Sequence, residues 1–315
     1  MLRHNLVTID LEAIRHNYRT LAGSLPKGVA VMPVVKADAY GHGLTQVARA
    51  VCGEGARFLA VALAEEGLLL RQSGVEADIL VLGAATERAA RAAVEAGLTQ
   101  PAFAPEQIAW LEDAARAVGR DALMHIKLDT GMGRIGLRSS AEADALSDAL
   151  KRAPHVRATA LYTHFADADE PLADGAPNAF TQEQLRRLEA LRSRFCPSLP
   201  VHAANSAASL YLKESFFFMV RQGISLYGYP PIPTALPFRP ALRWEAELVH
   251  VKDVAAGTPI GYGCAFVAPR DMRQPVRQNR KTARLSLISH RFFTPYLQRQ
   301  HRRGVEYSGN IPKRS

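Results

Sequence analysis

The sequence predicts an α/β fold, a (β/α)8 TIM-like barrel followed by a truncated β-rich domain. The first observation is that eight short, strand-like apolar runs alternate with longer segments whose apolar residues have helical spacing. The second is a proline-rich connector, after which apolar and polar residues alternate as they do along a strand. The eight runs lie near residues 29–35, 58–62, 78–82, 99–103, 123–129, 156–163, 199–203 and 219–223.

Two of the intervening helices have recognisable starts. Three apolar residues after Asp10 share one helical face: Ile14, Tyr18 and Leu21. Thr181 and Gln184 have capping-box spacing, which predicts that a helix begins at Thr181. An open doubly wound sheet is the alternative architecture, but no Gly-x-Gly-x-x-Gly turn follows an early strand.

The connector separates segments of the chain that have different patterns of apolar and polar residues. We expect residues 11–233 to form the barrel, and residues 1–10 and 234–273 to form the start of the β-rich C-terminal domain. Residues 274–315 lose the strand alternation and contain ten Lys or Arg against one acidic residue. This basic tail accounts for the whole net charge of +9, so the rest of the chain is balanced. We expect it to be poorly ordered.

Composition excludes several classes of protein. A hydrophobic fraction of 48% and a charged fraction of 22% are typical of a soluble globular protein. There is no apolar run long enough to span a bilayer, and the N-terminus lacks the apolar core of a secretion signal, so we expect a cytoplasmic protein without a membrane partner. Cys52, Cys196 and Cys264 suggest neither a disulfide framework nor a zinc site.

Lys36 is the most informative residue, because it directly follows the first predicted barrel strand. A lysine at the exit of a buried strand is partly desolvated, which lowers its pKa. It can then act as a Schiff-base nucleophile or a general base. A lone lysine at this position would more often be solvated and structural, so the interpretation depends on the surrounding residues.

The loops after the last two predicted barrel strands can bind a phosphate. Ser206 follows the seventh strand and opens a helix-like segment, and Gly223 follows the eighth strand and permits a close backbone approach. Phosphate sites in such barrels often lie in these two loops. A lysine after the first strand that faces them is the layout of a pyridoxal phosphate (PLP) enzyme.

Residues 36–43 read Lys-Ala-Asp-Ala-Tyr-Gly-His-Gly, and with this motif the chain resembles the alanine racemase family over about residues 3–273. The resemblance implies a PLP-dependent isomerase that interconverts L-alanine and D-alanine, supplies D-alanine for peptidoglycan and forms a homodimer. It also implies roles for the matching residues. Lys36 would hold PLP as a Schiff base, Arg221 would face the pyridine nitrogen, and the phosphate would contact Tyr40, Asn205, Ser206, Gly223 and Ile224.

Racemisation removes a proton from one face of Cα and returns it on the other, so two bases are expected. By resemblance, Lys36 serves the D-isomer and Tyr262, supplied across the dimer interface, serves the L-isomer. His164 and Arg134 match residues that support the tyrosine and the ring oxygen. Arg134 matches a contact of the substrate carboxylate, and Lys127 matches a lysine that is often carbamylated to hold this arginine.

Several alternatives stay open. His164, Asp167 and Asp169 could suggest a metal site, but no further nitrogen or sulfur ligand is spaced to join them, and we expect no metal. The tail is either a displaced sequence, as after a frameshift, or a basic arm for nucleic acid; we expect no nucleic acid partner. An incomplete β domain would give a PLP-binding remnant with little activity. Another racemase or a decarboxylase on the same barrel, and serine as substrate, also remain possible.

Overall fold

The computed structural model describes residues 5–246 and 248–277. The chain divides into two compact units, one formed by Val7–Arg243 and the other by Met1–Leu6 with Trp244–Ser315. Residues 278–315, most of the predicted basic tail, lie outside the described residues.

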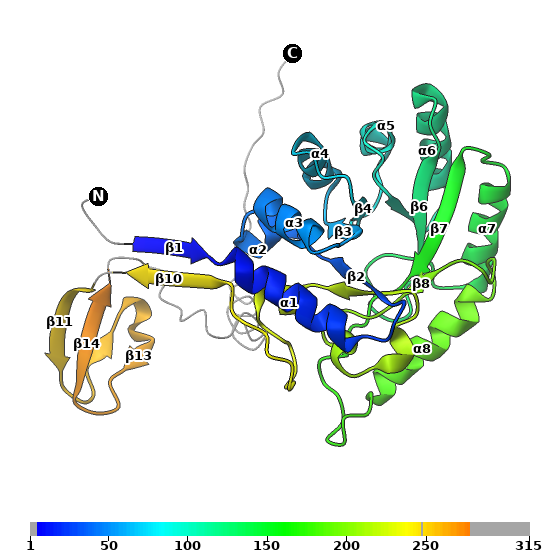
Figure 1. Ribbon diagram of the computed structural model, residues 1–315. Coiled ribbons are helices and arrows are strands. Elements are labelled where there is room, and N and C mark those ends of the chain that lie inside the picture. The colour runs from blue at the N-terminus through cyan, green and yellow to red at the C-terminus, as the bar shows by residue number, and fades with distance from the viewer. Residues whose placement is uncertain (1–4, 247, 278–315) are drawn as a thin grey trace, which may run out of the picture. The chain divides into compact units, whose positions relative to one another are not determined.

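The larger unit is a closed barrel of parallel strands, so the predicted (β/α)8 fold is confirmed (Figure 1). Ladder pairs and single bridges join consecutive strands from β2 to β8, and β2 pairs with β9. Two backbone hydrogen bonds, Phe218 N to Val201 O and Arg221 N to Ala204 O, link β9 to the β8 segment and close the ring. The strands are β2 (Ala30–Pro33), β3 (Phe58–Val61), β4 (Asp78–Val81), β5 (Gln100–Ala102), β6 (Ala122–Lys127), β7 (Val156–Tyr162), β8 (Val201–His202) and β9 (Met219–Gln222).

Helices surround the strands on the outside of the barrel (Figure 1). The α-helices are α1 (Leu11–Ser24), α3 (Leu44–Gly53), α4 (Ala64–Gln72), α5 (Glu87–Glu95), α6 (Pro105–Val118), α7 (Ser140–Lys151) and α8 (Ala179–Arg192). The short element α2 (Lys36–Gly41) is mostly a left-handed turn. Short 3-10 turns η1 (Ala208–Leu210), η2 (Lys213–Ser215) and η3 (Ile224–Tyr227) follow β8 and β9. Within the described residues, no helix combines the length and apolarity that crossing a bilayer requires.

Helix α1 begins where the sequence predicts, because the Asp10 carboxylate accepts hydrogen bonds from the backbone N–H groups of Glu12 and Ala13. The predicted start of α8 is wrong. Asn178 is the N-cap, and its side-chain oxygen accepts from Thr181 N at 2.8 Å. Thr181 is therefore inside the helix, and Gln184 does not close a capping box but donates to His164 O at 3.1 Å.

The barrel interior has an apolar side and a polar side. The apolar side comes from β2, β3, β4 and β9, where buried side chains form one cluster: Met32, Val34, Ala60, Leu80 and Met219. The polar side comes from β6, β7, β8 and β9, where buried side chains contact one another: His125, Lys127, Tyr162, His202 and Arg221. A larger apolar core fills the space between the strands and the surrounding helices.

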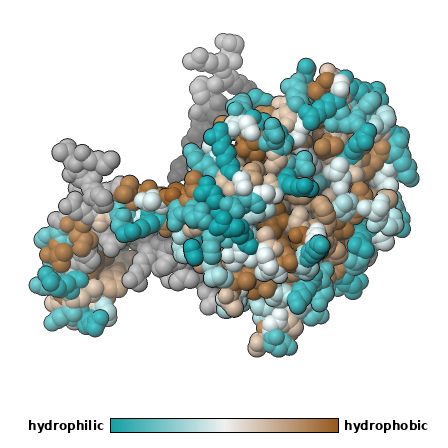
Figure 2. All heavy atoms as spheres, in the orientation of Figure 1, coloured by the Kyte–Doolittle hydropathy of each residue, from teal (hydrophilic) through white to brown (hydrophobic). Residues whose placement is uncertain are grey.

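The smaller unit is built from short strand pairs. Antiparallel β11 (Leu248–Val254) and β14 (Met272–Arg277) form one pair, and β12 (Pro259–Ile260) and β13 (Phe266–Val267) form another. Strand β10 (Leu242–Ala246) pairs with β1 (Asn5–Ile9). Strand β14 runs four residues past residue 273, the predicted end of the β-rich segment. Apolar side chains are exposed on this unit: Leu248, Val251, Phe266 and Val267. Figure 2 shows brown, hydrophobic atoms on its surface.

The observed start of α8 gives a direct test by paired substitutions. Replacing Asn178 by Ala removes the cap, so we expect the free energy of unfolding to fall by about 1 kcal/mol. Replacing Thr181 by Val should change it by less than about 0.5 kcal/mol, because the buried Thr181 hydroxyl has no hydrogen-bond partner among the described residues. Urea denaturation of both variants measures the difference, and a larger loss for Thr181→Val would restore the capping box at Thr181.

Candidate active site

Lys36 directly follows the segment that extends β2. The backbone N–H groups of Val34 and Val35 donate to Gln222 O and Ala60 O, so this segment is held between both neighbouring strands. The Lys36 side chain is partly buried, with Nζ 6.0 Å from the centroid of the Tyr40 ring. Burial lowers the pKa of Lys36, the positive charge of Arg134 lowers it further, and the carboxylate of Glu66 opposes both. The neutral amine is therefore easier to form than in water.

The turn after Lys36 is left-handed. The four residues from Ala37 to Tyr40 have φ of 53–54°, a conformation that costs roughly 1–2 kcal/mol for each non-glycine residue. Two carboxylates hold this turn: Glu66 Oε1 accepts from Ala37 N at 2.6 Å, and Asp38 Oδ1 accepts from Leu44 N at 2.7 Å. Backbone strain that is held in this way is typical of functional sites. Sequence reasoning missed Glu66, which lies 29 residues from its partner.

Tyr40, Ser206 and Gly223 meet at the same end of the barrel. The Ser206 hydroxyl oxygen accepts from Gly223 N at 2.9 Å. A Cβ added to Gly223 would lie 3.2 Å from the Tyr40 hydroxyl and 3.4 Å from the Ser206 hydroxyl. Two hydroxyl groups and the backbone of the loop that leads into η3 at Ile224 therefore surround a space beside Gly223 that a Cβ would crowd. Such a set of donors suits an oxyanion.

The Asn205 side chain is engaged by the backbone around it. Its Nδ2 donates to Phe165 O at 3.3 Å, and its Oδ1 accepts from Ala208 N at 3.1 Å. Asn205 therefore fixes the loop that carries Ser206 and joins it to the loop after β7. This is an indirect contribution to the oxyanion position, whereas Ser206 contributes its own hydroxyl.

Arg221 is the buried cation of the site, with 3% of its surface exposed. One terminal nitrogen donates to His202 Nδ1 at 2.8 Å and to His202 O at 3.1 Å. The other donates to Thr163 O and Ala203 O, both at 2.8 Å, and lies 3.3 Å from His164 Nδ1. Burial lowers the pKa of Arg221 to about 10, so the guanidinium stays charged at neutral pH.

His164 lies at the end of β7, beside Arg221. Burial and the positive charge of Arg221 hold the pKa of His164 well below its usual value, so its imidazole is neutral near pH 7. In the part of the chain that the structure describes, no cluster of three potential metal-binding side chains occurs around it. The neutral ring can accept or donate a hydrogen bond without adding charge.

Lys127 is almost fully buried, with 2% of its surface exposed, and Nζ donates to Leu128 O at 2.7 Å. Burial and the charge of Arg221 lower the pKa of Lys127 to about 7, although Asp129 opposes the shift. A large fraction of this amine is therefore neutral at pH 7 and nucleophilic. Arg134, on the loop after β6, is exposed and contributes to lowering the pKa of both Lys127 and Lys36.

Tyr262 lies in the smaller unit. It begins the 3-10 turn η4 (Tyr262–Cys264), and 87% of its surface is exposed. All the other predicted site residues lie in the unit formed by Val7–Arg243. The structure thus brings together Lys36, Tyr40, Ser206 and Gly223, and Arg221 with His164, while Tyr262 belongs to a different unit.

The first barrel strand leads into a desolvated lysine, close to a space that suits an oxyanion and to a buried guanidinium. This arrangement defines the class of protein: a barrel enzyme that uses a lysine side chain. Comparison with known proteins gives the family. The family model described as "Alanine racemase, N-terminal domain" matches residues 9–231. The chain belongs to the alanine racemase family of isomerases.

Individual relatives agree with this assignment. The alanine racemase of Geobacillus stearothermophilus is 41% identical over 273 residues, which cover 84% of this chain and 69% of the relative. The solved structure of alanine racemase from Streptomyces coelicolor A3(2) superimposes with a TM-score of 0.77 at 35% identity, covering 86% of this chain and 73% of that one. A histidine racemase from Leuconostoc mesenteroides subsp. sake is also similar, with a TM-score of 0.72 at 28% identity over 88% of this chain and 74% of that one.

The buried amine of Lys127 predicts a pH-dependent stability. Its pKa is lower in the folded chain than in the unfolded chain, so the unfolded state binds more protons above pH 7 and stability rises with pH. Between pH 7 and pH 9 this contribution reaches about 2–3 kcal/mol. Lys127→Met should lack the rise, as measured by urea denaturation in carbonate-free buffer. An equal rise in both proteins would contradict the shifted pKa.

Proposed function

We propose that this chain interconverts L-alanine and D-alanine with PLP, which Lys36 holds covalently. The observation that carries the proposal is the convergence of a desolvated lysine with the oxyanion position of Tyr40, Ser206 and Gly223 at one end of the barrel. The similarity to alanine racemases supports the same reaction.

The residues of the barrel fit PLP. The hydroxyl groups of Tyr40 and Ser206 and the backbone N–H groups of Gly223 and Ile224 would hold its phosphate. Arg221 would face the pyridine nitrogen, and because a guanidinium only donates, it would keep that nitrogen unprotonated. When bound, PLP supplies an electron sink that acidifies the Cα–H bond of the amino acid. An unprotonated ring is a weaker sink, which favours return of the proton to Cα over transamination.

Proton transfer then depends on two side chains of the protein. The lowered pKa of Lys36 suits it to take a proton from, or return one to, Cα of the D-isomer. Tyr262 of the partner subunit would serve the opposite face in a homodimer. Because the two bases belong to separate units of the chain, cofactor binding and racemisation can be tested separately.

Arg134 and Lys127 would prepare the substrate position. Arg134 is an exposed guanidinium that would bind the carboxylate of alanine. The neutral fraction of the Lys127 amine can react with carbon dioxide to form a carbamate, with loss of one proton. The product carries a negative charge, which would hold Arg134 and offset the nearby charge of Arg221.

Solvent exchange at Cα tests the proposed reaction. We expect the full chain to show the absorbance of lysine-bound cofactor, and Lys36→Ala to lose it. Deuterium from the solvent should enter both L- and D-alanine, with serine as the comparison substrate. Tyr262→Phe should slow exchange into L-alanine by about 100-fold or more and leave the cofactor absorbance unchanged. Bound PLP without exchange into either enantiomer would support the second candidate, a PLP-binding protein with little turnover.

The oxyanion position can be tested through Gly223. In Gly223→Ala the added methyl group would crowd the Tyr40 and Ser206 hydroxyls at 3.2 and 3.4 Å. We expect the affinity for PLP to fall by about tenfold or more, while the affinity for pyridoxal, which lacks the phosphate, changes little. Equilibrium titration of the apoprotein measures both affinities. An equal loss for the two ligands would place the phosphate elsewhere.

Carbamylation of Lys127 has a direct spectroscopic readout. In the presence of 13C-labelled bicarbonate we expect one slowly exchanging carbamate signal in the 13C NMR spectrum of the chain. The signal should be absent in Lys127→Met and retained in Lys151→Met, a matched change of an exposed lysine. A signal that survives in Lys127→Met would assign the carbamate to another amine.

A further inference from the structure

A cavity lies at the amino-terminal end of the barrel strands, opposite to Lys36. Its volume is about 150 Å³. Buried residues of β2, β4, β7 and β9 form its apolar walls: Met32, Leu80, Ala160 and Met219. Exposed side chains of Asp78, Thr159 and Phe218 lie around its mouth. In barrels of this type the interior is normally packed with side chains, so an open space at this end needs an explanation.

Two buried polar residues line this cavity, Thr99 before β5 and His125 on β6, and His125 is hydrogen-bonded to the polar side of the barrel interior. His125, on β6, has 8% of its surface exposed, and its Nδ1 lies 3.0 Å from Nε2 of His202. His202 in turn accepts from Arg221 through its Nδ1 at 2.8 Å. The three side chains form a line through the polar side of the barrel interior, from Arg221 to the cavity.

The direction of hydrogen bonding along this line is fixed by Arg221. A guanidinium can only donate, so Nδ1 of His202 accepts, and the proton of the neutral ring is on Nε2. His202 Nε2–H therefore donates to His125 Nδ1. Burial and the charge of Arg221 lower the pKa of His125 to about 3, so His125 is neutral and its single proton is on Nε2.

The Nε2–H group of His125 is left as a donor at the cavity wall. Among the residues that the structure describes, no acceptor is paired with it. An acceptor inside the cavity would give this donor a direct hydrogen-bond partner. The fixed tautomer means that the group cannot rearrange into an acceptor while Arg221 keeps its contact with His202.

The walls restrict what can supply that acceptor. An apolar lining makes the transfer of a charged group from water unfavourable, so a neutral molecule is favoured. A cavity of about 150 Å³ can hold a molecule of the size of benzene. The lining thus suits a small molecule that is mostly apolar and has one hydrogen-bond acceptor.

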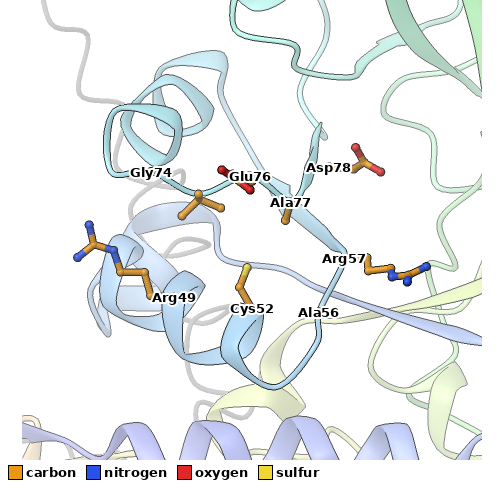
Figure 3. A pocket seen from close by; sticks show the side chains of 9 residues that line it. Arg49, Cys52, Ala56, Arg57, Gly74, Glu76, Ala77 and Asp78 are labelled. Atoms are coloured by element: carbon orange, nitrogen blue, oxygen red, sulfur yellow. The ribbon is translucent and has the colours of Figure 1, made fainter.

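A larger hollow of about 570 Å³ on the outside of the barrel does not have these properties. It lies between α3 and β4 and is lined by side chains of both charges together with the thiol of Cys52. In Figure 3, Arg49 and Arg57 point away from it on opposite sides. The side chains that line this hollow therefore do not favour any single class of ligand.

We propose that the cavity at His125 is a second binding site, separate from the candidate active site, for a neutral, benzene-sized molecule with one hydrogen-bond acceptor. The molecule accepts a hydrogen bond from Nε2 of His125 and packs against the methionine and leucine side chains of the barrel interior. The site depends on the geometry of His125, His202 and Arg221 and does not require that the chain racemises alanine.

Binding of two matched probes tests this site. Pyridine, which is neutral at pH 8, has one ring-nitrogen acceptor, and benzene has nearly the same shape without it. With the full PLP-loaded chain, we expect pyridine to bind about tenfold more tightly than benzene in calorimetric titration, as one hydrogen bond would give. In protein labelled with 15N-histidine, pyridine should shift the Nε2 resonance of His125 and benzene should not.

Two variants complete the test. His125→Phe removes the donor, so both probes should bind with equal affinity. Leu123→Trp fills the cavity from the wall and leaves the His125–His202 hydrogen bond in place, so it should abolish binding of both probes. Equal affinities in the unchanged chain, or no saturable binding because water alone occupies the cavity, would overturn the proposal.

Discussion

The buried charge of Arg221 is the constraint on which the candidate site depends. A guanidinium inside a barrel is tolerated only when its N–H groups find acceptors, and Arg221 finds them in the carbonyls of Thr163, His202 and Ala203 and in a ring nitrogen of His202. These acceptors lie on and directly after β7 and β8. Orienting one charged side chain therefore fixes the ends of two strands where substrate would bind.

The same charge determines the protonation of its neighbours. Burial is the first cause of the lowered pKa of His125, His164 and Lys127, and Arg221 is the second cause in all three. The two histidines are therefore neutral, and Lys127 has a pKa of about 7. Although the site contains several basic side chains, it holds few positive charges. The charge of Arg221 therefore dominates the electrostatic field at the site.

Parts of this arrangement follow from local sequence, and parts do not. The eight strands are predicted because each apolar run is short and bounded, and α1 is predicted because Asp10 is a strong cap next to an apolar face. The start of α8 was predicted wrongly, because a threonine and a glutamine three residues apart have capping spacing wherever they occur in a helix. Asn178, which bonds Asp167 and Glu170 as well as the helix, has the stronger set of contacts.

Some features of the candidate site also follow from local sequence, and others do not. The motif that begins at Lys36 predicts a lysine site. It does not predict the left-handed turn at residues 37–40, because this turn contains no glycine. The pairs that orient Arg221 are non-local: His202 lies 19 residues from Arg221 and 77 residues from His125. Residues this far apart form no local pattern, so their hydrogen bonds depend on closure of the barrel.

The line from Arg221 through His202 to His125 can transmit polarisation but cannot transfer protons. Proton transfer along it would require Arg221 to lose a proton, against a pKa of about 10, or His125 to gain one, against a pKa of about 3. Neither occurs near neutral pH. Polarisation needs no such step, because each donor in a hydrogen-bonded chain strengthens the next. The hydrogen bond from His125 to an acceptor is therefore strengthened by the same guanidinium that faces the candidate active site. The charge of Arg221 thus acts at both ends of the barrel.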